Sequence, residues 1–93
     1  GELDAFQRDI LGPLDALADD VRENLLRTLE LLLATGMNVA ETARQGGWHY
    51  NTVRYRVARL AELLGPFVTD GMCLESLSLA LLVRAELGGD VDG

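Results

Sequence analysis

Apolar residues in the first part of the chain recur at the spacing of amphipathic helices. Between residues 3 and 11 they return every three or four positions, and a glycine-proline pair at 12–13 ends the pattern. A wider apolar stripe follows and stops at Gly36; its members are Val21, Leu25, Leu26, Leu29, Leu32 and Leu33. The pattern predicts two helices, the second of them capped by Asp19 or Asp20.

A short helix is predicted next, from Asn38 to a glycine pair at 46–47. The Asn38 side chain can cap the first turn, and Glu41 three residues later gives a pattern close to a capping box. The residues expected to face inward are small, so the backbone can approach its neighbours: Val39, Ala40 and Ala43. A tight turn follows the glycine pair.

A longer helix is predicted from Tyr50 or Asn51 to about Leu64, before a glycine-proline pair. Its apolar face carries Val53, Val57, Leu60 and Leu64. At about 100° per residue the opposite face is polar; it carries Asn51, Thr52, Tyr55, Arg59 and Glu62, with Arg54 and Arg56 on its flanks. A last helix, from about Cys73 to Leu87, is apolar nearly all round and must be covered on more than one side.

The composition is that of one ordered domain, because 48% of the 93 residues are hydrophobic. No segment alternates as a strand does. We therefore expect an all-α fold, a small bundle of about five helices that contains a helix-turn-helix. Residues 1–20 are expected to be a lead-in connector from a preceding region, residues 21–88 the main domain and residues 89–93 a flexible tail.

The charge is segregated along the chain. A net charge of −7 argues against nucleic acid, because neutralised phosphates supply most non-specific affinity for DNA. However, the segment from Thr42 to Ala61 holds no acidic residue and four arginines: Arg44, Arg54, Arg56 and Arg59. A single cationic surface on an otherwise acidic domain is therefore expected.

Enzymes and metalloproteins find little support in this sequence. Cys73 is the one cysteine and His49 the one histidine, so we expect no intramolecular disulfide, no metal site and no cofactor. There is no nucleophile paired with a base at a readable spacing, and no glycine-rich phosphate loop. Without a signal peptide or an apolar run long enough to span a bilayer, we expect a soluble, cytoplasmic domain that does not enter a membrane.

A short helix, a glycine-containing turn and a second helix bearing arginines form a helix-turn-helix, whose second helix lies in the major groove. Residues 38–44 (NVAETAR), His49 and residues 51–56 (NTVRYR) resemble the C-terminal helix-turn-helix of the PucR/CdaR family. The resemblance extends over about residues 25–87. It implies a bacterial transcription regulator with a Fis-like fold that binds double-stranded DNA, and an effector, if any, bound by a sensory region outside this chain.

The resemblance also implies the residues that contact DNA: His49, Tyr50, Asn51, Thr52, Arg54 and Tyr55, with Arg44, Arg56 and Arg59 on phosphates. Arg54 is the best candidate for a base contact, since a bidentate arginine–guanine pair discriminates by ~1–3 kcal/mol. His49 is either a solvated turn residue or a phosphate contact, and Tyr55 is alternatively a core aromatic. One reading helix buries little surface, so a homodimer on a palindromic or repeated site is expected.

Three residues depart from the family pattern. Gly46 stands where leucine is common, Trp48 where a small apolar residue is common, and Tyr50 where the family has an arginine. We hypothesise that the indole of Trp48 fills the space a leucine at position 46 would occupy. Because Tyr50 lacks the charge of that arginine, neither the DNA affinity nor the base preference of the family can be carried over to this chain at that position.

One alternative function belongs to a different class. The acidic surface and the excess of leucines on the last helix, which leave room for a dimer seam, also suit a protein-interaction or dimerisation module with weak or no DNA binding. Such a module would keep its binding after the arginines are removed.

Overall fold

The computed structural model describes the backbone of residues 1–92 and the side chains of residues 1–87. Within that part of the chain there are helices and no strands: α1 (Glu2–Leu11), the 3-10 helix η1 (Gly12–Ala16), α2 (Asp19–Ala34), α3 (Val39–Gly46), α4 (Tyr50–Leu64) and α5 (Gly71–Asp92). The all-α prediction with about five helices is confirmed.

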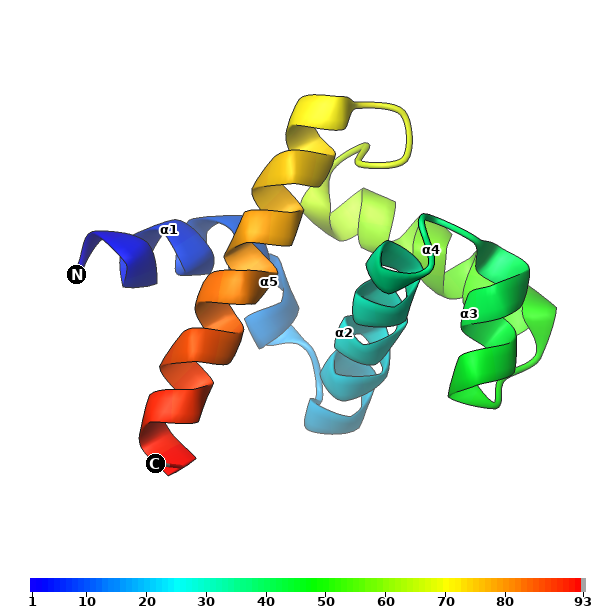
Figure 1. Cartoon of the computed structure of the whole chain (residues 1–93), viewed down its shortest axis with the longest axis horizontal. Coiled ribbons are helices and arrows are strands. Elements are labelled where there is room, and N and C mark those ends of the chain that lie inside the picture. Colours follow the sequence, from blue (N-terminus) through cyan, green and yellow to red (C-terminus); the bar gives the residue numbers. More distant parts are fainter. Residues whose placement is uncertain (93) are drawn as a thin grey trace.

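The helix α2 stands in the middle of the domain (Figure 1). On one flank lies α3, joined by a tight turn to α4, and both helices contact α2. On the other flank α1 packs against α5. The helix-turn-helix of α3 and α4 therefore projects from one end, and the N-terminus and the end of α5 lie on the other side of α2 (Figure 1).

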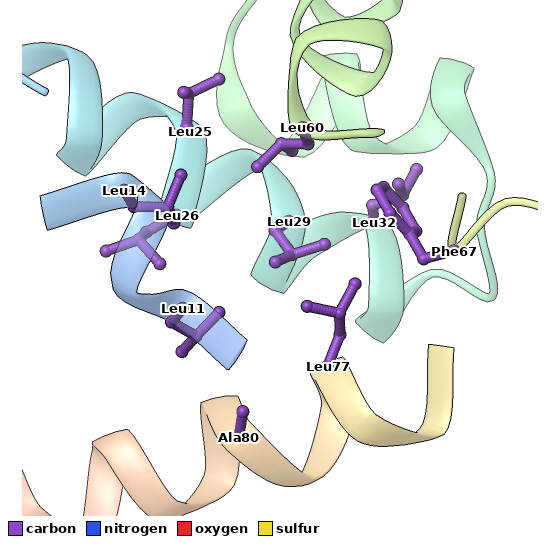
Figure 2. Close-up of a cluster of buried hydrophobic side chains, with 10 residues drawn as sticks. All are labelled: Leu11, Leu14, Leu25, Leu26, Leu29, Leu32, Leu60, Phe67, Leu77 and Ala80. Atoms are coloured by element: carbon purple, nitrogen blue, oxygen red, sulfur yellow. The ribbon is translucent and has the colours of Figure 1, made fainter. Parts of the chain in front are cut away.

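One hydrophobic cluster takes its buried members from all these elements except α3 (Figure 2), and the half-buried Val39 of α3 packs against it. The elements α1, η1, α2, α4 and α5 supply nine of its members, and Phe67 comes from the loop before α5; the members are Leu11, Leu14, Leu25, Leu26, Leu29, Leu32, Leu60, Phe67, Leu77 and Ala80. Because Leu60 of α4 is fully buried against this cluster, the orientation of α4 is fixed by the core of the whole domain.

The predicted cap of α2 is wrong. Asp19 is the first residue of the helix, Ala18 is the N-cap, and no side chain caps this end. Asp19 and Asp20 instead lie in the first turn, where the helix dipole favours carboxylates, and Asp19 accepts a hydrogen bond from Arg22 at 2.6 Å. Val21, placed in the apolar stripe by periodicity, is 43% exposed.

The last helix is longer than predicted. The Asp70 carboxylate accepts the backbone N–H groups of Met72 and Cys73 at 3.0 and 3.3 Å, so α5 begins at Gly71 rather than Cys73. The helix also passes Leu87 and continues to Asp92. Of the predicted tail 89–93, Gly93 lies outside the described residues.

No helix in the described part of the chain is both long enough and apolar enough to span a bilayer. The division into a connector, a main domain and a tail stays a prediction, although Leu11 at the end of α1 is buried in the common core.

Candidate nucleic-acid interface

The first helix of the motif, α3, has well-defined ends. The Asn38 side-chain oxygen accepts the N–H of Glu41 at 2.9 Å, which confirms the predicted cap. At the other end Gly47 takes a left-handed conformation (φ 72°), and the chain turns sharply toward α4. The predicted capping box is not completed, because the Glu41 carboxylate binds Arg44 and Gln45 instead.

The inward face of α3 differs from the prediction at one residue. Ala43 is buried and Val39 half-buried, but Ala40 is exposed. Thr42, two residues further along and about 200° round the helix from Ala40, is fully buried. Its hydroxyl donates to the Asn38 carbonyl oxygen at 2.8 Å and lies 3.1 Å from the Thr35 hydroxyl, so the buried polar atom is satisfied.

Trp48 occupies the space that a side chain at position 46 would need. A Cβ atom added to Gly46 would lie 2.2 Å from the Trp48 Cε3 atom, far inside van der Waals contact. The Arg56 guanidinium covers the indole with its central carbon 4.7 Å from the ring centroid, and it also donates to the Thr28 hydroxyl at 3.4 Å. The position of the indole supports the hypothesis that Gly46 and Trp48 compensate each other, but the hypothesis expects a largely buried indole and Trp48 is half-buried.

His49 caps the second helix of the motif. Its Nδ1 atom accepts the N–H of Asn51 at 3.2 Å, and α4 begins at Tyr50 as predicted. The sequence offered only a solvated turn or a phosphate contact for this exposed residue. Histidine is not among the preferred N-cap residues, which explains why the capping role was missed.

The outer face of α4 is solvent-exposed along its first two turns. Asn51 and Arg54 are exposed, Tyr50 is 48% exposed and Tyr55 70%. Val53 and Leu60, on the opposite face, are fully buried. The alternative in which Tyr55 is a core aromatic is therefore wrong, and the predicted division of α4 into a polar outer and an apolar inner face is confirmed.

A hollow of about 310 Å³ lies between α4 and the N-terminal half of α2. From α4 it is lined by Thr52, Tyr55, Arg56 and Arg59, and from α2 by Val21, Asn24 and Leu25. Four of the predicted contact residues thus share one depression beside the outer face. The same depression accounts for the exposure of Val21.

The four arginines of the cationic segment have different surroundings. Arg44 binds the Glu41 carboxylate through two nitrogens, one of them Nε at 3.0 Å, and Arg59 lies 3.3 Å from the Glu62 carboxylate. Arg56 is held by Trp48 and Thr28. Arg54 makes no ion pair with any described residue and is exposed, which leaves its guanidinium available to a ligand.

The Glu41–Arg44 pair is charged over the whole neutral range. The Arg44 guanidinium, followed by the Gln45 amide, lowers the pKa of Glu41 to about 2, and the Glu41 carboxylate raises the pKa of Arg44. The side chains of Arg44 and Glu41 are 71% and 35% exposed, so solvent screens the pair and its stabilising effect is smaller than the pKa shift alone implies. The pair also means that an anion approaching Arg44 competes with the Glu41 carboxylate.

Metal ligands are not gathered anywhere in the described residues, where no three His, Cys, Asp or Glu side chains stand close enough to hold an ion. Cys73 is half-buried, and its thiol lies 3.7 Å from the Leu64 carbonyl oxygen. Together, α3 and α4 carry exposed cations and hydrogen-bonding groups of the kind that can bind an anion.

Comparison with known proteins gives matches over the same segment. The model of the PucR C-terminal helix-turn-helix domain matches residues 25–83. A "Purine catabolism regulatory protein" from Bacillus subtilis (strain 168) is 40% identical over 73 residues, which are 76% of this chain and 14% of that relative. The chain thus spans about 14% of the length of this curated relative. No solved structure matches the chain significantly.

Proposed function

This chain belongs to the family of PucR C-terminal helix-turn-helix domains, and from that premise we propose that it binds duplex DNA sequence-specifically with α4 in the major groove. The family places the domain among the DNA-binding parts of transcription regulators. The observation that carries the finer proposal is the outer face of α4, where Asn51, Arg54 and Tyr55 are exposed and no acidic residue lies between Thr42 and Ala61.

Base contacts are assigned to the first turns of α4. Tyr50, Asn51 and Arg54 are exposed at the end of the helix that enters the groove, and their side chains carry donors and acceptors that base edges can pair with. Among these three residues, Arg54 should contribute most to the free energy of DNA binding, because no described side chain forms an ion pair with it. Tyr50 replaces a family arginine, so the base opposite it is expected to differ from the one the family prefers.

Phosphate contacts are assigned to the sides of the motif. Arg44 lies on α3 and Arg59 in the second half of α4, and His49, Thr52 and Tyr55 supply further hydrogen-bonding groups for phosphate oxygens. Arg56 has a second role, because its contacts with Trp48 and Thr28 also fix the turn against α2. The acidic remainder of the domain repels phosphates and confines DNA to this face.

Two parts of the proposal concern a longer polypeptide. The curated relative is far longer than this chain, so there is room in such a protein for a region that senses an effector. One reading helix gives a small interface, and two copies on half-sites about one helical turn of DNA apart would supply useful specificity. A footprint of a full-length protein over a single, unrepeated half-site contradicts the dimeric part.

The test is a fluorescence anisotropy titration of labelled duplex DNA at several salt concentrations. The variant Arg44→Gln/Arg54→Gln removes two exposed arginines of the interface. Its matched control, Arg8→Gln/Arg27→Gln, removes two exposed arginines elsewhere and causes the same change in net charge. The two variants also remove the same number of ion pairs, because Arg8 is paired with Asp4 at 3.1 Å and Arg44 is paired with Glu41.

The interface variant should bind at least about tenfold more weakly, and the slope of log K against log salt should fall by about one for each phosphate that the variant no longer neutralises. The control should stay within about twofold. Equal weakening of both variants would mean that binding follows net charge alone, and undiminished DNA binding by the interface variant would mean that the DNA surface lies elsewhere. No binding of duplex DNA by the wild-type domain would favour the protein-interaction function.

A further inference from the structure

A second concave surface lies on the opposite side of α2 from α4. A shallow groove of about 370 Å³ runs between the C-terminal half of α2 and the middle of α5, and a smaller hollow of about 120 Å³ continues it toward the start of α2. The two share Glu30 and Leu81, so they form one groove, here called the α2/α5 groove. Figure 1 shows α5 on the flank of α2 that faces away from α3.

The floor of this groove is apolar and its edges are charged. Leucines line it from both helices: Leu26 and Leu33 from α2, with Leu81 and Leu82 from α5. Leu82 is 60% exposed, an unusual state for a leucine beside three others. The α2 edge carries Glu23 and Glu30, and the α5 edge carries Arg84.

The dimensions suit a helix. The groove follows α2 from Glu23 to Ala34, which at 1.5 Å per residue is about 16 Å, or roughly three helical turns. Glu23 and Glu30 are seven residues apart, so their carboxylates repeat every two turns along one edge. A helix lying in the groove would meet them with two side chains that are also seven residues apart.

We propose that the α2/α5 groove binds an amphipathic helix of a partner protein, with leucine-type side chains on its buried face and lysine or arginine along the edge beside α2. Apolar grooves with charged edges hold such helices through anchors at helical spacing, and the edge charges set their orientation. Arg84 requires a carboxylate on the opposite edge of the partner, near the start of α2.

The charges argue against a second copy of this chain as the occupant. Over residues 71–87, α5 carries one arginine, Arg84, and two glutamates, Glu75 and Glu86, so a second α5 helix could not place two cations seven residues apart against Glu23 and Glu30. The α1 helix offers a single arginine, Arg8, already paired with Asp4. The arginine-rich helix, α4, is anchored in the domain core through Leu60 and cannot leave it.

The test uses the whole chain and a designed probe. The probe is a labelled 15-residue helical peptide with leucine at every third or fourth position, two lysines seven residues apart on one side of the leucines, and one glutamate on the other side to meet Arg84. A matched peptide has glutamate in place of both lysines. Binding is measured by anisotropy and located by amide chemical shifts of the isotopically labelled protein.

Two pairs of variants locate the contact. Leu82→Glu lies in the groove, and Leu79→Glu is its control on the same helix, 51% exposed but outside the groove lining. Glu30→Lys reverses an edge charge, and Glu75→Lys makes the same charge change on an exposed residue of α5 outside the lining.

The lysine peptide should bind at least about tenfold more tightly than the glutamate peptide, with shifts along residues 23–34 and 78–85. Leu82→Glu and Glu30→Lys should each weaken it by about tenfold, and their controls by less than about twofold. Equal affinity for both peptides, shifts centred elsewhere, or a concentration-dependent dimer that Leu82→Glu abolishes would overturn the proposal, the last in favour of a second copy. The proposal does not depend on DNA binding, so it can fail or succeed separately.

Discussion

The contact between Gly46 and Trp48 makes a quantitative prediction because two effects of opposite sign meet at one position. Alanine is a better helix former than glycine by up to about 1 kcal/mol, so Gly46→Ala in an ordinary helix would stabilise the protein. Here the added Cβ lies 2.2, 2.3 and 2.7 Å from three atoms of the indole. Overpacking of this kind costs about 1–3 kcal/mol, so the steric term outweighs propensity and Gly46→Ala should destabilise by about 1 kcal/mol.

When the indole is absent, Gly46→Ala should stabilise the protein instead of destabilising it. Trp48→Ala alone should cost about 2 kcal/mol, roughly half the value for a fully buried tryptophan, since Trp48 is half-buried and stacked on Arg56. In that background the methyl group added by Gly46→Ala has free space, and the substitution should stabilise by up to about 1 kcal/mol. The double-mutant cycle should therefore give a coupling of about 2 kcal/mol between the two positions.

Urea denaturation followed by circular dichroism at 222 nm measures all four proteins, because Trp48 is the one tryptophan and fluorescence is lost with it. Gly71→Ala is the control: nothing lies within 4 Å of its added Cβ, and it should not destabilise the protein. If Gly46→Ala is neutral or stabilising with Trp48 present, or if the two changes are additive within about 0.5 kcal/mol, the compensation hypothesis is refuted.

Three further predictions concern the motif. Asn38→Ala removes the cap of α3 and should cost about 1 kcal/mol in urea denaturation; an unchanged midpoint would mean the cap contributes nothing. Gly47→Ala forces a side chain into a left-handed conformation (φ 72°) and should cost about 1 kcal/mol or more, whereas Gly47→Asn should cost less. Folding lowers the pKa of Glu41 from 4.5 to about 2, so the ionised carboxylate stabilises the fold above pH 4.5, and this stabilisation is lost as the pH falls toward 2. The melting temperatures of wild type and Glu41→Gln should therefore converge between pH 4.5 and 2. A difference that stays constant over this interval would contradict the ion pair.

The positions and ends of the helices could largely be predicted from the sequence, because they depend on residues that are close together in the chain. Helix periodicity located five helices, and the Asn38 cap and the glycine pair at 46–47 marked the ends of α3 correctly. These signals are local, because a helix hydrogen-bonds to itself within four residues. The last helix was predicted to start at about Cys73 and begins two residues earlier, because the Asp70 carboxylate caps its first turn.

Features that depend on distant residues were not predicted. Phe67 is almost fully buried, yet it stands in a loop where no periodicity indicates burial. Thr28 is fully buried, and its hydroxyl donates to the Asn24 carbonyl oxygen at 2.7 Å, a contact that makes burial of a polar side chain tolerable. Arg54 and Arg56 flank the same face of α4, but only the fold brings Trp48 and Thr28 against Arg56 and leaves Arg54 exposed.

The position of α2 relates the two proposed surfaces to each other. Side chains that face α4, such as Val21 and Thr28, and side chains that line the α2/α5 groove, such as Leu26 and Glu30, lie about half a turn apart around α2. A helix bound in the groove would therefore cover none of the residues assigned to DNA. Because the groove edge carries two carboxylates, its occupant must be cationic there, and a cation so placed reduces the repulsion between the domain and DNA. The lysine peptide should accordingly leave DNA bound and slightly increase its affinity at low salt, whereas competition between the two would mean that they share a surface.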